Sequence, residues 1–158
     1  GRGVYVKCEE FAPALSLKFD EDGLEDVSVQ KKKKSKSVLF VSTGSMLSEV
    51  IQASRNLMIE NIEADIYSLR FLNKVDVNHL FEYAKNRDAV IFVEDGICRG
   101  GVSEELEYEL LKRGFNKTAV NALPEKFLSQ GTRGEICEDV KMDPRSLAEC
   151  AYKVVYRK

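Results

Sequence analysis

The adjacent carboxyl groups of Glu94 and Asp95 have the clearest capacity for chemistry in this sequence. They follow the apolar stretch 89–93, and carboxyl groups at a strand end can serve as general acid and general base. Adjacent side chains of a strand point to opposite faces, however, so these two would not reach one substrate atom. We therefore expect them to cap a helix or to contact a subunit rather than to catalyse.

A cysteine nucleophile is the next candidate, because Cys98 stands beside Arg99 and a neighbouring cation lowers the pKa of a thiol. Nucleophilic catalysis by cysteine normally also needs a base. The single histidine, His79, falls in the first turn of a predicted helix, and nothing in the sequence brings it to Cys98. We expect an exposed or capping role for His79, and we predict no catalytic residue in this chain.

Two segments could hold anions. The turn Thr43-Gly44-Ser45 precedes a predicted helix, whose free N–H groups can receive a phosphate. It lacks both the G-x-G-x-x-G pattern and the P-loop lysine, so a structural turn is favoured and a phosphate site stays the alternative. The basic run 31–36 is typical of a solvated loop, with polyanion binding as its alternative.

Composition narrows the class of protein. The 158 residues fit one domain, 44% are apolar and 32% are charged, and the net charge of −2 gives no argument for nucleic acid as a partner. No apolar run reaches the roughly 20 residues that span a bilayer, so we expect no membrane partner. Four scattered cysteines without a Cys-x-x-Cys pair indicate reduced thiols and no metal site.

The elements that must position these residues alternate along the chain. Short apolar runs predict buried strands, and each strand is followed by a 3-and-4 spacing of apolar residues that predicts a helix. The expected strands are 38–41, 64–69, 89–93 and 117–123, and Ser45, Asp76, Ser103 and Asp143 are the expected N-caps. We expect an open, mainly parallel, twisted α/β sheet with helices on both faces and an antiparallel edge strand.

The first 36 residues differ from the rest. Apolar and polar residues alternate within 14–30 around Asp22-Gly23, which predicts a hairpin or an edge strand. We therefore divide the chain into a linker with an edge strand or hairpin and a lysine-rich loop, 1–36, and an α/β domain, 37–158. The sequence opens without methionine, so we expect a fragment of a longer chain.

The strand-end motifs form an ordered set. VLFVSTGS (38–45), ADIYSLRFLNKVD (64–76) and VIFVEDGICRGG (90–101) resemble, in this order, the C-terminal domain of the transketolase superfamily. LPEKFLSQGTRG (123–134) is similar to a segment of the 1-deoxy-D-xylulose-5-phosphate synthases. Transketolases and 2-oxoacid dehydrogenase E1 β-subunits share weaker versions and remain alternatives, as does a free-standing Rossmann-like binding module.

The resemblance implies a transferase that condenses pyruvate with glyceraldehyde 3-phosphate for isoprenoid synthesis, in the bacterial cytoplasm or a plastid. Thiamine diphosphate and Mg²⁺ would be held by preceding domains of the same chain and not by this one, which would support a homodimer and be inactive alone. Arg2 resembles a phosphate-binding arginine of the family. We expect domain or subunit contacts from Ser45, Glu94, Gly100 and Gly101.

Overall fold

The computed structural model describes residues 1–8 and 35–157. Five strands form one sheet in the order β1-β3-β2-β4-β5, with β1 antiparallel to β3 and the other pairs parallel. The strands are β1 (Val4–Val6), β2 (Lys36–Ser42), β3 (Ile62–Ser68), β4 (Ala89–Ile97) and β5 (Thr118–Leu123). The helices are α1 (Leu47–Ile59), α2 (Val77–Ala84), α3 (Val102–Lys112), α4 (Arg133–Asp139) and α5 (Pro144–Val155).

The sheet is covered on both faces, which explains the uninterrupted apolar runs of its central strands. Side chains of Val38 and Phe40 pack with α1 and α5, whereas those of Leu39 and Val41 pack with α2 and α3. Because successive side chains alternate between faces, a strand covered twice needs apolar residues at every position. The predicted α/β class with helices on both faces is therefore confirmed.

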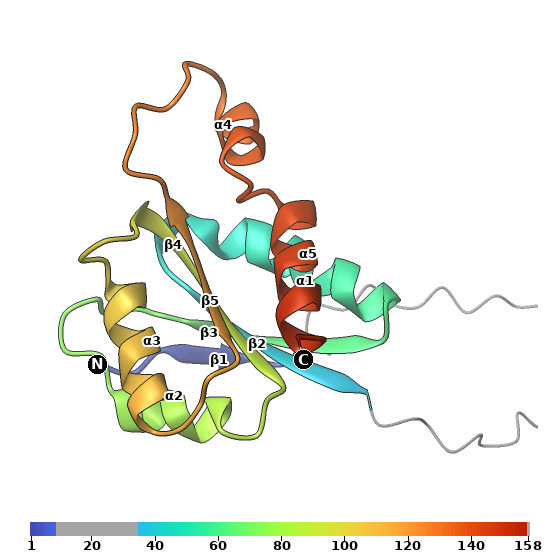
Figure 1. Cartoon of the computed structure of the whole chain (residues 1–158), viewed down its shortest axis with the longest axis vertical. Coiled ribbons are helices and arrows are strands. Elements are labelled where there is room, and N and C mark those ends of the chain that lie inside the picture. The colour runs from blue at the N-terminus through green and yellow to red at the C-terminus, as the bar shows by residue number, and fades with distance from the viewer. Residues whose placement is uncertain (9–34, 158) are drawn as a thin grey trace, which may run out of the picture.

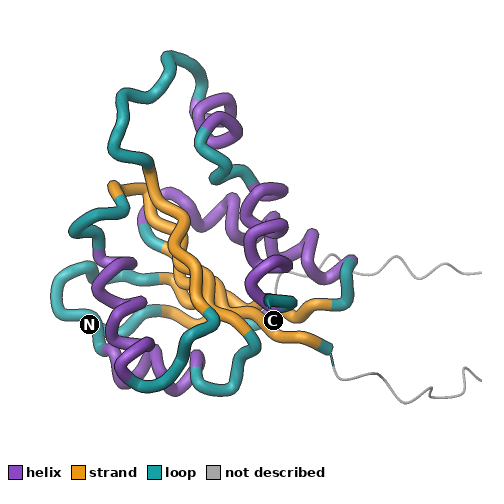
Figure 2. Tube along the Cα trace, viewed as in Figure 1, coloured by secondary structure: helices purple, strands orange, loops and turns teal. Residues whose placement is uncertain are grey.

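The strand order places a switch in the direction of the connections between the neighbouring strands β2 and β4, and we call the place outside their carboxyl ends the crevice. The chain leaves β2 through α1 toward β3 on one side, and it leaves β4 through α3 toward β5 on the other (Figure 2). Ligands of open α/β sheets bind where the connections diverge in this way, outside the carboxyl ends of the strands. We call this side of the molecule the carboxyl edge.

The antiparallel edge strand is β1, near the start of the chain. Its Tyr5 hydroxyl and the backbone N–H of Cys8 both donate to the carboxylate of Asp65, which is also paired with Arg87. Burial raises the pKa of Tyr5 to about 12, and the hydrogen bond to Asp65 adds to this effect. These contacts fasten β1 to the sheet. The hairpin predicted within 14–30 and the lysines 31–34 lie outside the described residues.

Two predicted caps are wrong. Ser45 lies inside a short 3-10 turn, Gly44–Met46, and Met46 precedes α1, because the Ser45 hydroxyl is bonded to Asp95 instead. Ser103 lies inside α3, where its buried hydroxyl has no partner within the described part of the chain. The predicted caps Asp76 and Asp143 are confirmed by their hydrogen bonds to the first turns of α2 and α5.

Candidate functional site

Asp95 fills one side of the crevice at the carboxyl edge. Its carboxylate accepts hydrogen bonds from the backbone N–H of Ser45 at 2.9 Å, the Ser45 hydroxyl at 3.1 Å and the Thr43 hydroxyl at 3.3 Å. The hydrogen bond from the Ser45 N–H is the main reason why the pKa of Asp95 is lowered. Gly44 has a φ of +53°, and a Cβ there would lie too close to this carboxylate, so a side chain at position 44 would be strained.

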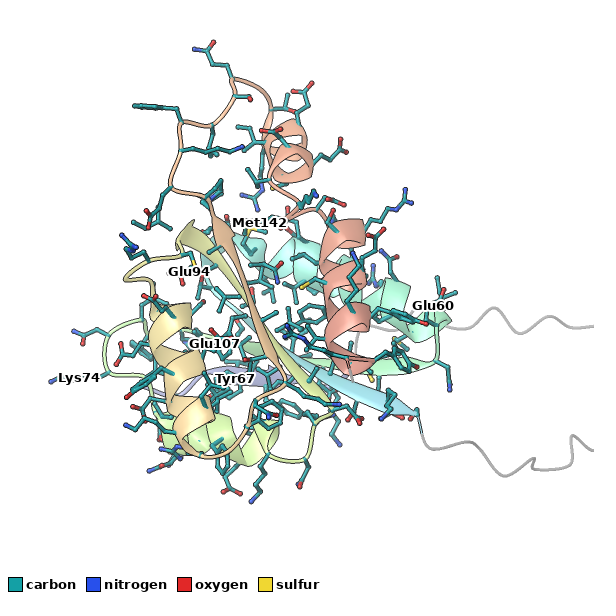
Figure 3. All side chains as sticks on the ribbon, in the orientation of Figure 1. Glu60, Tyr67, Lys74, Glu94, Glu107 and Met142 are labelled. Carbon is teal, nitrogen blue, oxygen red and sulfur yellow. The ribbon has the colours of Figure 1, made fainter. Side chains whose placement is uncertain are left out.

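Glu94 serves the opposite side of the same strand end. Figure 3 shows it between the end of β4 and the start of α3, where its carboxylate accepts from the N–H groups of Ser103 at 2.9 Å and Val102 at 3.3 Å. Gly101, the N-cap of α3, lets the chain pass close to Glu94, because a Cβ there would meet the Ile97 carbonyl oxygen at 2.6 Å. The carboxylate thus caps α3 from outside the helix.

The pair Glu94-Asp95 therefore does what its alternation along the strand predicted, since each carboxylate serves a different helix start. The consequence for ligands is direct. The Ser45 N–H already donates to Asp95 and the Thr43 N–H donates to the Val93 carbonyl oxygen, so a phosphate at this turn would meet the negative charge of Asp95. The structure therefore supports the structural turn over the phosphate site.

Arg133 is the first residue of α4, and it connects the segment between β5 and α5 to this crevice. Its guanidinium donates to the Ser45 hydroxyl at 2.8 Å and to the Ser45 carbonyl oxygen at 3.0 Å, and it pairs with Glu49 of α1 at 3.1 Å. The sequence analysis did not single out Arg133 or α4. The start of this helix could have been predicted, because Thr132 and Glu135 form the capping box at which it begins.

A pocket of about 390 Å³ lies beneath α4. Its walls are mostly apolar, with Arg133, Ser45 and Asp95 at the polar part of the lining, and burial raises the pKa of the Cys137 thiol there. The other lining residues are Met46, Leu123, Leu128, Ile136 and Met142. The carboxylate of Asp95 in this lining is already hydrogen-bonded to Ser45 and Thr43.

The other candidate groups are not brought together. The pKa of the Cys98 thiol is raised, first because of burial and then because of nearby glutamates, which argues against an activated thiolate. Arg99 is 3.7 Å from Glu125 instead. His79 is half-buried and hydrogen-bonded through Nδ1 to the Tyr67 hydroxyl at 2.7 Å, which is a structural role.

Arg2 lies at the carboxyl edge, beside the loop that follows β3. Its Nε donates to Asp76 at 3.2 Å, and the Gly1 carbonyl oxygen accepts from the Asp76 N–H at 2.8 Å. The side chain is 74% exposed. Among residues 1–8 and 35–157, no cluster of histidine, cysteine, aspartate or glutamate could hold a metal ion. The helices of this part of the chain are too short or too polar to cross a membrane.

Comparison with known proteins gives one family. A sequence model described as "Transketolase, C-terminal domain" matches residues 28–147. The 1-deoxy-D-xylulose-5-phosphate synthase of Corynebacterium jeikeium is 29% identical over 137 residues, which are 86% of this chain and 21% of the relative. The same enzyme of Arthrobacter sp. is 30% identical over 146 residues, 90% of this chain and 22% of the relative.

The corresponding enzyme of Treponema pallidum is 35% identical over 101 residues, 63% of this chain and 16% of the relative. The chain thus spans only about a fifth of the length of these curated relatives. A solved structure titled "Split gene transketolase, inactive beta4 tetramer" superimposes with a TM-score of 0.66 at 22% identity, covering 77% of this chain and 40% of that one. This likeness shows the fold.

Proposed function

The chain belongs to the family of transketolase C-terminal domains, and we propose that it is this domain of a 1-deoxy-D-xylulose-5-phosphate synthase. The longer enzyme would condense pyruvate with glyceraldehyde 3-phosphate, releasing CO2, in the first step of isoprenoid precursor synthesis. The synthases among the curated relatives support this choice within the family.

In this proposal the chain is a scaffold that performs no chemistry. The observation that carries it is the filling of the crevice: Asp95 and Glu94 occupy the helix starts where an open α/β sheet would hold an anionic ligand. We expect neither thiamine diphosphate nor Mg²⁺ in the crevice, because Asp95 and Glu94 take its anion positions. We assign both to the preceding domains of the longer enzyme.

Arg2 is the residue that we propose to reach the substrate. Its Nε is bonded to Asp76, while the described structure gives its two terminal nitrogens no partner. An arginine held by one nitrogen presents the remaining donors in a fixed direction, which suits a phosphate group. We propose that it contacts the phosphate of glyceraldehyde 3-phosphate.

The assembly and location of the longer enzyme are also part of the proposal. We expect a homodimer with two-fold symmetry, in which Ser45, Glu94, Gly100 and Gly101 lie near a domain or subunit contact. Four free thiols suit a reducing compartment, such as the bacterial cytoplasm or a plastid.

A chimaera tests the proposal. The part of the Treponema pallidum synthase that this chain matches is replaced by the chain, and formation of 1-deoxyxylulose 5-phosphate is measured. We expect an active chimaera, and no activity and no thiamine diphosphate binding by the isolated chain in calorimetry. A chimaera that is inactive, or micromolar binding of thiamine diphosphate by the isolated chain, would refute the proposed function.

A further inference from the structure

Large apolar side chains are exposed at the carboxyl edge. Phe127 is fully exposed, and Phe71, Leu72 and Ile97 are each more than half exposed. Phe71 and Leu72 follow β3, Ile97 ends β4, and Phe127 follows β5, so they come from the carboxyl ends of three strands on one side of the sheet. Exposed apolar side chains that gather on one side are typical of a surface covered by another polypeptide.

These strand ends and the loops that follow them are tied to one another. The Leu69 N–H donates to the Ser42 carbonyl oxygen at 2.8 Å, and the Thr43 N–H donates to that of Val93 at 3.0 Å, which joins the ends of β3, β2 and β4. Arg99 and Glu125 then link the loop after β4 to the loop that carries Phe127. A surface whose parts are held in place before binding loses less conformational entropy when a partner covers it.

The loop that carries Phe127 is also anchored to the body of the domain, through Leu128 and Arg133. Leu128 lines the pocket beneath α4, whereas its neighbour Phe127 is fully exposed. One side chain of this loop therefore faces the protein and the next faces solvent. Arg133 fixes the far end of this loop to Ser45 and Glu49. A fully exposed aromatic side chain on an anchored loop has the character of an interface anchor.

The charge around these apolar residues is positive. Arg70 and Lys74 are exposed and form no ion pair with any residue in the described ranges, and Lys74 extends away from the body of the molecule in Figure 3. Arg2 and Arg99 are 74% and 84% exposed, each with one acidic neighbour. A partner that covers this surface needs acidic groups opposite these cations.

The start of the chain lies on the same surface. Gly1 packs against Phe71 and is bonded to the backbone of Lys74 and Asp76. A polypeptide joined ahead of Gly1 would begin within reach of Phe71 and Leu72. The relatives that match this chain are about five times longer.

We propose that the carboxyl-edge surface, formed by Phe71, Leu72, Ile97 and Phe127 with Arg70 and Lys74, docks onto an apolar surface with an acidic rim in the part of the enzyme that precedes Gly1. The inference rests on the proposed function and adds to it the surface, the anchor residues and the chemistry of the partner.

The chimaera described above provides the test, with substitutions in this surface. Phe127→Ser and Phe71→Ser should each lower its activity about tenfold or more. The double reversal Arg70→Glu with Lys74→Glu should do the same and reduce the salt dependence of activity. Ile59→Ser, at an 83% exposed position of α1, and Lys153→Glu, on α5, are the matched controls and should stay within about twofold.

The unfolding midpoint of each variant of the isolated chain is measured in parallel, and it should be unchanged because these side chains are exposed. An active chimaera whose surface variants match the controls would overturn this inference and leave the proposed function standing. An inactive parent chimaera would overturn both. Self-association of the isolated chain that Phe127→Ser abolishes would identify a second copy as the occupant and would also overturn it.

Discussion

Replacing Asp65 by asparagine should strongly destabilise this protein, because it leaves a buried cation without its partner. The side chain of Asp65 is 7% exposed and that of Arg87 is 17% exposed, with 2.5 Å between Arg87 Nη2 and Asp65 Oδ2. The carboxylate also accepts from the Tyr5 hydroxyl and, at 2.8 Å, from the Cys8 N–H. Asparagine keeps the shape of the side chain and removes its charge.

Removing one partner of a buried ion pair costs about 3–5 kcal/mol. Native domains are stable by only about 5–15 kcal/mol, so this change would consume a large part of the total. For a chain of this size, a loss of 3–5 kcal/mol corresponds to a drop in the unfolding midpoint of roughly 6–20 °C. Asp88→Asn is the matched control: it faces Lys36 in a partly exposed pair, and we expect a loss of about 0–1 kcal/mol.

The effect of Asp65→Asn should depend on pH. Burial by itself would raise the pKa of Asp65, but hydrogen bonds from Tyr5 and Cys8 and the charge of Arg87 outweigh it and hold the pKa below its ordinary value. A lowered folded-state pKa means that the stabilisation is present at neutral pH and is lost in acid, below about pH 4. The difference in stability between wild type and variant should therefore narrow there.

Thermal and urea unfolding, followed by circular dichroism at pH 7 and pH 3.5, measure both effects. The double substitution Asp65→Asn with Arg87→Met should recover part of the loss, since no buried cation remains. Equal losses for Asp65→Asn and Asp88→Asn at pH 7 would refute the reasoning, as would a difference that stays constant with pH.

Three further changes test the site. Gly44→Ala should lower the free energy of unfolding by about 1–3 kcal/mol in urea, because position 44 has a positive φ and the new Cβ would lie too close to Asp95. Gly134→Ala is the control and should leave the free energy of unfolding unchanged, because the space around Gly134 is open. Glu94→Ala should cost about 1–3 kcal/mol by leaving two N–H groups of α3 without an acceptor, and Glu94→Gln should cost less; equal losses would contradict the role of the charge. Cys98 is the only one of the four thiols that is exposed, so dithiodipyridine should modify it first. A fast phase that survives Cys98→Ser would show otherwise.

Much of the fold could be predicted because its signals are local. The fully apolar stretches Val38–Val41 and Val90–Val93 predicted strands buried on both faces, and the structure has them at the centre of the sheet. Asp76 and Asp143 were recognisable as caps because each bonds to N–H groups no more than three residues away. Interactions of this range depend only on which residues follow one another.

The candidate site could be predicted only in outline. The alternation of side chains along β4 indicated that Glu94 and Asp95 serve different partners, but not which ones. Asp95 takes the donors of Ser45, 50 residues earlier, and for that reason Ser45 is not the cap that its position suggested. The helix α4 was not predicted, although Thr132 and Glu135 have the residue types and spacing of its capping box.

The sequence by itself determined the alternation of strands and helices and the two-sided burial of the sheet. Only the tertiary structure decided that carboxylates of this chain close the crevice, that Arg133 fastens α4 to α1 across 84 residues, and that β1 pairs with β3. The reason is physical. A hydrogen bond between distant segments exists only after packing has brought them together, and no local pattern of residues records that distance.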